Sequence, residues 1–401
     1  MSNLEKILLL ATISIFIAIS VFSYAYVDLN LTLSTNYSVV SFISAMQKLG
    51  YYQRPLASAI YVFLISSAFG LYFINLYFAK KNKISQNYVV KTIIISSLIL
   101  IFAYPFLSSD IFNYIFDAKI ITYYHLSPYV HKALDFPNDD WTRFMRWTHR
   151  YSPYGPIWLL ISVVPSILGL GKFVLNLYLF KLMMAAFNLF NVYLIYKISQ
   201  KAKNLNPLFA TAFYALNPLV LIEGIANAHN DVLVATFILL SIFFLQNKSN
   251  TRTVIAIIIG TLIKYVPVLM IPPLLYRRFD KKQSFDKFIF VNLATISIFT
   301  FIISTLHLNL PLFSSSTQTQ FQPWYLLWVL PLIALISTTD ILILTITVSF
   351  FSLLRYLPFI YLGDWSHKGT ILYMVLVLTL PMLLIAIILV IKKYIKLLNK
   401  W

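Results

Sequence analysis

The sequence predicts an all-α polytopic membrane protein, and its composition supports this fold class in two ways. Of the 401 residues, 60% are hydrophobic and only 11% are charged, whereas soluble domains have about 45–50% apolar and about 25% charged residues. The apolar residues are gathered in runs of roughly 15–25, which is the length that a helix needs to enter or cross a bilayer. The 33 Phe and 27 Tyr suit helices with aromatic belts at the membrane interfaces.

The charged residues agree with this class. The chain has 31 Lys and Arg against 13 Asp and Glu, a net charge of +18, which in a soluble protein would suggest nucleic acid as a partner. Here the basic residues lie in short loops between apolar runs, as the positive-inside rule requires, and some can contact anionic lipid headgroups. The absence of Cys excludes disulfides and thiolate metal sites. We therefore expect membrane lipids, and no nucleic acid, as partners.

About ten apolar runs are expected to cross the membrane. The first could pass for a signal peptide, but it is long enough to span and no small-x-small cleavage site follows it. In chain order the runs are Ile7–Tyr26, Leu56–Ala79, Val89–Leu107, Phe173–Tyr196, Leu208–Ile222, Val232–Leu245, Phe288–Leu306, Trp324–Ile336, Ile341–Leu357 and Ile371–Ile391. Basic loops at 80–83, 197–203, 248–252 and 277–282 and the basic tail at 392–400 are expected to be cytoplasmic.

Two further apolar runs are expected to be broken or re-entrant. Pro156–Leu170 is too short to cross untilted, and if it crossed, the lysines at 197–203 would fall on the wrong side. Val254–Leu275 contains Lys264 and three prolines, and we expect it to be a bent hairpin with Lys264 near its tip. Irregular backbone at membrane depth is tolerated where it lines a cavity in the protein. In total, about 10–13 membrane segments are expected.

The predicted organisation is one integral membrane domain over residues 1–401, with no separate soluble domain and both termini cytoplasmic. A polar loop, residues 108–155, carries Asp and His residues and arginines, although acidic residues are scarce elsewhere in the chain. The topology puts this loop on the extracytoplasmic side. A polar loop held between membrane helices is where a membrane-embedded enzyme would carry its chemistry, so we expect an extracytoplasmic catalytic loop.

Asp110 begins this loop, about one turn beyond an apolar run. Tyr114 and Asp117 follow at spacings of four and seven residues, which puts the three side chains on one helical face. A carboxylate in a partly dehydrated cavity at the membrane boundary can serve as a general base. The alternative interpretation is a helix cap or an ion pair within the loop.

A second group in the loop is basic and aromatic. Asp139 or Asp140 is expected to cap a short helix on which Arg143, Arg146 and Arg150 share one face, with His149 beside them. Guanidinium groups in this arrangement can hold a phosphate. The alternative is an interfacial helix that contacts lipid headgroups.

Lys264 is a single cation inside a long apolar run. Such a residue must reach the interface, form an ion pair or face a cavity, and a lipid-linked phosphate would satisfy it. We therefore expect Lys264, Arg146, Arg150 and His149 to form a cationic group that binds a phosphate.

Polar side chains also cluster after the run that ends at Ile222. Asn227, His229, Asn230 and Asp231 are expected to bind sugar or to support a catalytic residue, with Glu223 nearby. The alternatives are polar contacts between helices or, less favoured, a metal site that would need further ligands.

Gln322 and Trp324 end a loop without Lys, Arg, Asp or Glu. An amide next to an aromatic face suits carbohydrate, and an aromatic belt is the alternative. No Gly-rich phosphate loop, zinc-binding helix or serine nucleophile elbow is present. No cofactor is indicated, and a divalent metal is left open.

Two motifs resemble those of GT-C glycosyltransferases. Asp110-x-x-x-Tyr114 followed by Ser127-Pro128-Tyr129 resembles their first external loop, and the segment from Tyr151 through Tyr154 to Pro156 resembles the proline-rich segment that re-enters the membrane. The likeness is greatest to the polyprenyl-phosphate-mannose-dependent mannosyltransferases of bacterial envelope lipoglycans and to the first mannosyltransferase of GPI-anchor assembly. It covers most of Phe102–Pro331 and includes Asn227–Asp231, Gly260–Lys264 and Gln322–Pro331.

This resemblance implies a multi-pass enzyme in the plasma membrane of a prokaryote. It would transfer a sugar, most simply mannose, from a polyprenyl phosphate to a lipid-linked or envelope glycan acceptor on the external face, with Asp110 as general base. Tyr114, Asp117, Tyr129, Tyr154, the Asn227–Asp231 cluster, Gln322 and Trp324 would bind sugar or acceptor. The GPI-type enzymes have Asp-x-Asp before the tyrosine, and this chain has Asn113 in place of the second acid. A two-acid metal site is therefore not implied.

Two other functions remain open from the sequence. A flippase or transporter of lipid-linked glycans would have inverted repeats and charges near the bilayer midplane, whereas the polar residues here gather at one face. An envelope polymer ligase would also have a long external loop, but it would take preassembled glycan from a diphosphate lipid.

Overall fold

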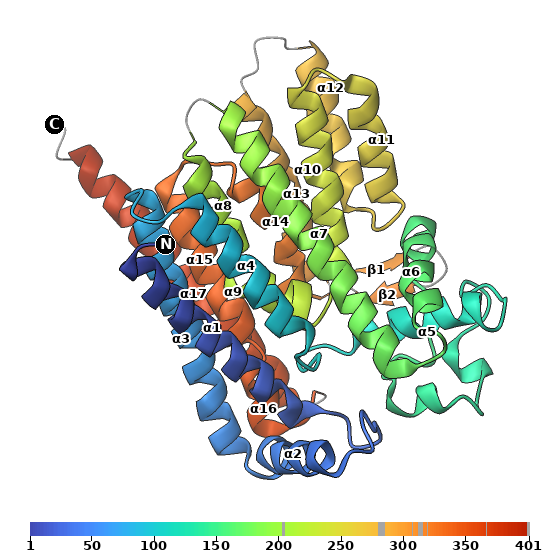
Figure 1. Cartoon of the computed structure of the whole chain (residues 1–401). Helices are drawn as coiled ribbons and strands as arrows, with labels where there is room; N and C mark the ends of the chain where they lie inside the picture. The colour runs from blue at the N-terminus through green and yellow to red at the C-terminus, as the bar shows by residue number, and fades with distance from the viewer. Residues whose placement is uncertain are drawn as a thin grey trace.

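The computed structural model describes residues 1–202, 205–279, 285–306, 308–311, 316–318, 320–365 and 367–398. The regular secondary structure of this part is helical apart from one antiparallel pair of short strands, β1 (Asn309–Pro311) and β2 (Ser316–Gln318) (Figure 1). The predicted all-α class is confirmed. The helices are α1 (Asn3–Ser23), α2 (Tyr37–Gln47), α3 (Arg54–Lys80), α4 (Gln86–Ile101), α5 (Asp110–Thr122), α6 (Pro156–Leu168), α7 (Phe173–Lys201), α8 (Pro207–Ala215), α9 (Pro218–Leu221), α10 (Asp231–Gln246), α11 (Asn250–Thr261), α12 (Ile271–Phe279), α13 (Phe285–Thr305), α14 (Leu326–Ile333), α15 (Thr339–Leu354), α16 (Leu357–Leu362) and α17 (Lys368–Leu398).

The described helices are those of an integral multi-pass membrane protein. Six helical stretches are long and apolar enough to cross a bilayer: Asn3–Tyr26, Arg54–Lys80, Phe173–Lys201, Phe285–Thr305, Thr339–Leu362 and Lys368–Lys392. A seventh consists of α8 and α9 with the turn that follows, bent by 50°. Five shorter apolar helices accompany them, which fits the expected broken or re-entrant segments.

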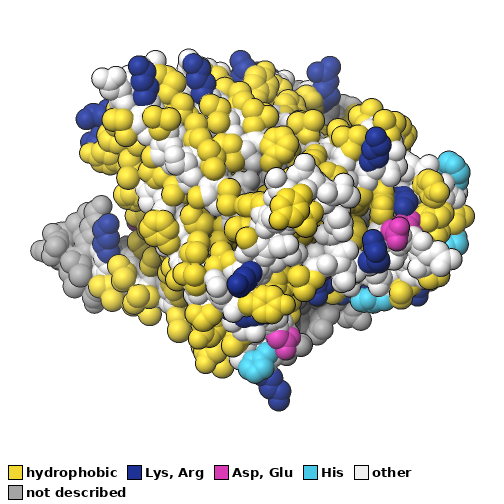
Figure 2. Space-filling view, turned by 60° about the horizontal axis from the view of Figure 1, so that its bottom comes forward, with side chains coloured by type: hydrophobic (Ala, Val, Ile, Leu, Met, Phe, Trp, Pro, Cys, Tyr) yellow, Lys and Arg dark blue, Asp and Glu magenta, His cyan; other side chains and the backbone are white. Residues whose placement is uncertain are grey.

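The surface has the pattern that a bilayer requires. Figure 2 shows hydrophobic side chains over most of one face, with Lys and Arg along its upper edge. Phe63, Phe73, Phe301 and Leu383 are each at least 60% exposed. Exposure of so many large apolar side chains would be unfavourable in water and is expected where lipid replaces water as the solvent.

The basic loops come together at one end of the molecule, the upper end in Figure 1. Asn206 donates to Asn82 at 3.1 Å, which joins the loops after α7 and α3. Lys201 donates to Asn247, which joins the loop after α7 to the one after α10. We call this the basic end. Lys203, Lys281, Lys282 and Lys400 lie outside the described residues.

Helix α6 follows the expectation of a segment that does not cross. It has 13 residues, so it is about 20 Å long. It starts where the N–H of Gly155 donates to the carbonyl of Ile263 at 3.1 Å. Shortly after it ends, the ring of Phe173 at the start of α7 packs on Phe144 of the loop, with 4.6 Å between centroids. Helix α6 therefore leaves the loop and returns to it.

The helical run that contains Lys264 is also broken as predicted. Helix α11 ends at Thr261, and a 3₁₀ turn from Val266 to Met270 leads into α12. Gly260 allows the chain to fold back tightly, because a Cβ at this position would come within 2.9 Å of the Pro267 side chain. Lys264 lies in the break between the two elements.

Two elements differ from the sequence-based expectation. The run Val89–Leu107 is helical only to Ile101, because Pro105 lacks an N–H and disfavours helical backbone before it. The freed carbonyl of Ala103 accepts a hydrogen bond from the fully buried ammonium group of Lys181 on α7. The polar segment between the first two spans, expected to be a loop, contains α2.

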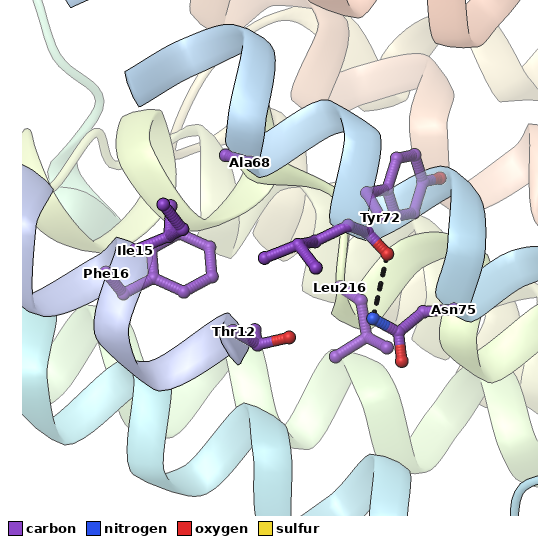
Figure 3. A pocket seen from close by; sticks show the side chains of 8 residues that line it. Thr12, Ile15, Phe16, Ala68, Tyr72, Asn75 and Leu216 are labelled. Atoms are coloured by element: carbon purple, nitrogen blue, oxygen red, sulfur yellow. Dashed lines mark hydrogen bonds between the residues drawn. The ribbon is translucent and has the colours of Figure 1, made fainter. Parts of the chain in front are cut away.

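The interior is closely packed where α1 and α3 meet. A void of about 10 Å³ is lined by Thr12, Phe16, Tyr72 and Asn75, and the Asn75 amide donates to the carbonyl of Leu71 at 2.9 Å. Figure 3 shows the side chains around it. A void of this size holds at most one water molecule. It therefore has no room for a substrate.

Candidate active site

The site begins where α5 begins. Asp110 is the first residue of this helix, and its backbone N–H donates to the Ser108 hydroxyl at 3.3 Å. A carboxylate in the first turn of a helix is favoured by the helix dipole, which stabilises its charged form. The Asp110 side chain is 20% exposed, so a ligand can reach it.

A histidine lies between Asp110 and a second carboxylate. The Nδ1 atom of His229 is 3.6 Å from Oδ2 of Asp110, and its Nε2 atom is 3.4 Å from Oε2 of Glu223. His229 and Glu223 are fully buried. The Trp324 ring stacks on the imidazole, with 3.9 Å between centroids and 18° between planes. The stacking fixes the plane of the imidazole, whose two nitrogens face Asp110 and Glu223 without forming a hydrogen bond to either.

Glu223 belongs to a hydrogen-bonded group at the turn before α10. Its Oε2 atom accepts from the Asn227 amide at 2.9 Å, and its Oε1 atom accepts from the Tyr356 hydroxyl at 3.0 Å. The chain forms a π-helical turn from Ile222 to Ala226, a form often found at functional sites. Ala228 then has φ +56°, a left-handed conformation that is unfavourable for a residue with a side chain. The packing around His229 therefore has to hold this backbone in place.

The second charged pair of the site is Asp231 with Lys264. The Lys264 ammonium donates to both carboxylate oxygens, at 2.9 and 2.7 Å, and the Trp328 indole donates to Oδ1 at 2.5 Å. Asp231 is fully buried, whereas the Lys264 side chain is 20% exposed. Because α10 and α11 form an antiparallel pair, the first residue of α10 and the break after α11 lie at the same level (Figure 1).

Aromatic side chains connect the two charged pairs. The Tyr114 hydroxyl donates to Asn230 at 3.4 Å, and the Tyr114 ring meets Tyr154 edge to face at 5.0 Å. Lys264 lies 5.8 Å from the centroid of Tyr154. The Tyr129 hydroxyl donates to the carbonyl of Tyr154 at 2.8 Å, so the Ser-Pro-Tyr segment supports the segment that carries Tyr154. Burial raises the pKa of Tyr154 well above its ordinary value, so this residue is a neutral hydrogen-bonding group.

Most of the residues predicted for this site are therefore brought together. Asp110, Tyr114, Tyr154, Asn227, His229, Asn230, Asp231, Lys264 and Trp324 are linked through the contacts above. Gln322 ends the extended segment that leads to Trp324. Sequence reasoning noticed Glu223 without committing to it, and it missed Trp328 and Tyr356. Nothing in the sequence separates these aromatic residues from the many that line ordinary membrane helices.

The predicted basic helix face is wrong. Asp139 caps the short helix as expected, because its carboxylate accepts from the N–H of Trp141 at 2.9 Å. The helix is a 3₁₀ turn that ends at Phe144, and the chain is extended at Met145. Arg143, Arg146 and Arg150 therefore share no helical face. The N–H of Met145 closes the turn by donating to the carbonyl of Thr142, and the extended backbone at Met145 prevents a second turn.

The loop arginines and the histidine lie apart from the Lys264 pair. The Arg150 guanidinium carbon lies 4.5 Å from the centroid of the Trp147 ring, and the centroid of the His149 ring lies 6.5 Å from it. Arg146 is exposed and lines a separate cavity, described below. The carboxylate of Asp139 forms an ion pair with Lys119, with 2.5 Å between Oδ2 and Nζ. Burial opposes the charge on Asp139, but hydrogen bonds from Lys119, Trp141 and Tyr124 lower its pKa.

Asp117 lies one turn beyond Tyr114 on α5 and is buried. Burial raises its pKa from 3.8 to about 7, and a hydrogen bond with Ser152 opposes this shift. Because a metal ligand must be deprotonated, a carboxyl group with a pKa near neutral is a weaker ligand for a metal ion than an ordinary aspartate. In the part of the chain that the structure describes, no group of three or more His, Asp or Glu could hold a metal.

The raised pKa of Asp117 predicts a pH-dependent stability. Between pH 3.8 and about 7 the folded protein keeps a proton that the unfolded chain has released. The free energy of unfolding therefore falls as the pH rises through this interval and levels off above it. We expect Asp117→Asn to make the thermal unfolding midpoint less dependent on pH. Melting curves of both proteins in detergent across this interval check the prediction, and equal slopes would contradict it.

The helices and this site define a class: a multi-pass membrane protein with a polar, acid-rich site built from one loop and several helix ends. The chain belongs to the MptA_B family, described as Alpha-(1->6)-mannopyranosyltransferase, N-terminal domain, whose model matches residues 10–279. The protein is thus a membrane mannosyltransferase, and the expected GT-C mannosyltransferase is confirmed. The matched region includes Asp110, His229, Asp231 and Lys264. No curated protein and no solved structure matches the chain.

Proposed function

We propose that the enzyme transfers mannose from a polyprenyl phosphate to a hydroxyl group of a glycan or lipid-linked acceptor. The reaction takes place on the extracytoplasmic side of a prokaryotic plasma membrane, with both termini in the cytoplasm. The basic loops support this orientation because they gather at one end, which the positive-inside rule assigns to the cytoplasm. The family description supports the sugar and the α-(1→6) linkage.

Asp110 is the proposed general base. Of the three carboxylates in the site, Glu223 and Asp231 are fully buried and hydrogen-bonded, whereas Asp110 is partly exposed. This observation carries the proposal, because a base must reach the hydroxyl group that it deprotonates. The acceptor oxygen attacks the anomeric carbon, its proton passes to Asp110, and the bond from that carbon to the phosphate oxygen breaks. The leaving phosphate keeps the electron pair.

Lys264 is the proposed partner of the leaving phosphate. An ammonium group has three N–H donors, and Asp231 accepts two of those of Lys264. The third is available to a ligand at the exposed part of the side chain. A donor fixed in place before the reaction can stabilise charge as it develops. Arg150 and His149, which both contact the Trp147 ring, remain proposed sources of further positive charge for the phosphate. Arg146 lines a separate cavity.

Tyr129, Tyr154, Gln322 and Trp324, which are only partly buried, are proposed to surround the sugar or the acceptor. Tyr114, Asn227 and Asn230 are fully buried and are proposed to hold these groups in place. His229 is proposed to orient Asp110 rather than to contact sugar, because it is fully buried between two carboxylates.

A donor screen tests the proposed function. Purified protein is given mannosyl, glucosyl and arabinosyl polyprenyl phosphates of short chain, and GDP-mannose, each with the same mannoside acceptor. We expect transfer from mannosyl polyprenyl phosphate and none from GDP-mannose. Preference for the nucleotide sugar would refute the proposed donor, and preference for another polyprenyl sugar would refute the proposed sugar.

The proposed role of His229 leads to a separate prediction. We expect His229→Ala to lower kcat by roughly 10²-fold, since a misplacement of about 1 Å can cost this much. The KM for the donor should change little, because His229 is buried away from the ligand. Tyr356→Phe, which removes one hydrogen bond from the far side of Glu223, should have a smaller effect. A large rise in donor KM with unchanged kcat in His229→Ala would contradict the orienting role.

A further inference from the structure

A second cavity lies beside the site and contains none of its residues. Its volume is about 310 Å³, and its walls come from the segment after α1, the turn before α3 and the end of the short helix in the loop 108–155. The polar residues that line it are Asp28, Asn30, Tyr51, Arg143 and Arg146. The volume is at the lower end of the range of about 300–1,000 Å³ that is typical of small-molecule sites.

The cavity is joined to the segment that carries Asp110 from two sides. On one side, the N–H of Asp28 donates to the Tyr104 hydroxyl at 3.3 Å, and the ring of Tyr104 packs against Phe112 of α5 at 6.0 Å. On the other side, the Asn113 amide donates to the carbonyl of Trp147 at 3.3 Å, next to Arg146. Phe112 and Asn113 lie in the same turn of α5 as Asp110. The walls of the cavity are therefore in contact with the first turn of α5, which carries the proposed base.

The chemistry of the walls suits a neutral glycan better than a phosphate. A sugar presents hydroxyl groups that both donate and accept hydrogen bonds, and the cavity offers a carboxylate, an amide, a phenol and two guanidinium groups. The carboxylate of Asp28 would repel a phosphate at close range. One guanidinium group, that of Arg143, is also partly engaged by Asp140 at 3.8 Å.

We propose that this cavity binds the mannosyl acceptor, so that acceptor and donor reach Asp110 from different sides. This inference rests on the proposed function. The acceptor enters between two polar segments, those of residues 27–53 and 108–155. The donor approaches Lys264, which lies at a break between apolar helices and is therefore close to a lipid chain. Arg146 then contacts the acceptor rather than the donor phosphate.

A binding experiment without donor tests the inference separately from transfer. Isothermal titration calorimetry measures the Kd of a synthetic alkyl α-(1→6)-linked dimannoside for the purified full-length protein in detergent. We expect Asn30→Ala and Arg146→Ala each to raise this Kd about tenfold, the effect of losing one hydrogen bond to a charged or polar partner. Both side chains are exposed, so both variants should fold.

Two variants serve as controls. Arg252→Ala removes the same charge from an exposed position on α11 near the basic end (Figure 1), and its Kd should equal that of the wild type. Asp110→Asn should also bind the dimannoside as the wild type does while losing transfer. The inference is wrong if both cavity variants bind normally, if the wild type does not bind the dimannoside, or if inorganic phosphate displaces the sugar from the cavity. A failure of the donor screen would leave the binding result unchanged.

Discussion

Asp110→Asn is expected to lower the rate of mannosyl transfer by about 10²–10⁴-fold, the usual contribution of a general base. The substitution removes the basic oxygen while it keeps the size of the side chain. The helix start should persist, because its hydrogen bond to Ser108 comes from the backbone N–H of residue 110. Radiolabelled mannose transfer at saturating donor and acceptor measures the effect.

Asp140→Asn is the matched control for this prediction. Asp140 is an acid in the same loop whose side chain is 83% exposed, and its partner Arg143 is exposed as well. A surface ion pair of this kind contributes little to stability. The Asp140 variant should retain full activity, and its melting temperature should match that of Asp110→Asn. If Asp110→Asn were as active as the control, another group would have to act as the base.

The second large effect is expected at Lys264. Lys264→Met leaves the Asp231 carboxylate buried without its cation, a change that typically costs about 3–5 kcal/mol of stability. It also removes the proposed hydrogen bond to the donor phosphate, so transfer should be lost as well. The melting temperature in detergent and the transfer rate are both expected to fall, whereas Lys172→Met, at an exposed lysine, should change neither.

A double variant separates the two roles of Lys264. In Lys264→Met with Asp231→Asn no buried charge is left alone, and the neutral amide can still accept the hydrogen bond from Trp328. We expect much of the lost stability to return while transfer stays low. If transfer returned together with stability, Lys264 would be only the structural partner of Asp231, and the proposed contact with the phosphate would be wrong.

Much of the fold could be predicted from the sequence. The apolar runs agree closely with the long helices, as in the run Phe173–Tyr196 and helix α7 (Phe173–Lys201), because burial in lipid demands a continuous stretch of apolar residues. The two broken segments, Pro156–Leu170 and Val254–Leu275, were also predictable. If either crossed the membrane fully, the basic loops would lie on opposite sides of it. Helix α2 was not predictable, because its 11 residues are too few to form a membrane-spanning run.

The candidate site was predictable only in part. Asp110 and Lys264 are conspicuous because a charged side chain near or within apolar segments is costly and needs a reason. Their partners are not conspicuous: no spacing rule links Lys264 to Asp231, which is 33 residues away, or Asp110 to His229. The arginines of the loop appeared to share a helix face because the sequence pattern does not distinguish a single 3₁₀ turn from an α-helix.

The sequence by itself determined that the chain lies in a membrane, where most of its apolar helices lie and which polar residues are out of keeping with their apolar surroundings. These properties depend on local composition, which every stretch of the chain carries within itself. Only the tertiary structure decided that His229 faces both Asp110 and Glu223, that Asp231 pairs with Lys264, and that Arg146 lines a cavity of its own. Such pairings depend on how distant helices pack, and packing is set by the shapes of many side chains at once rather than by any one segment.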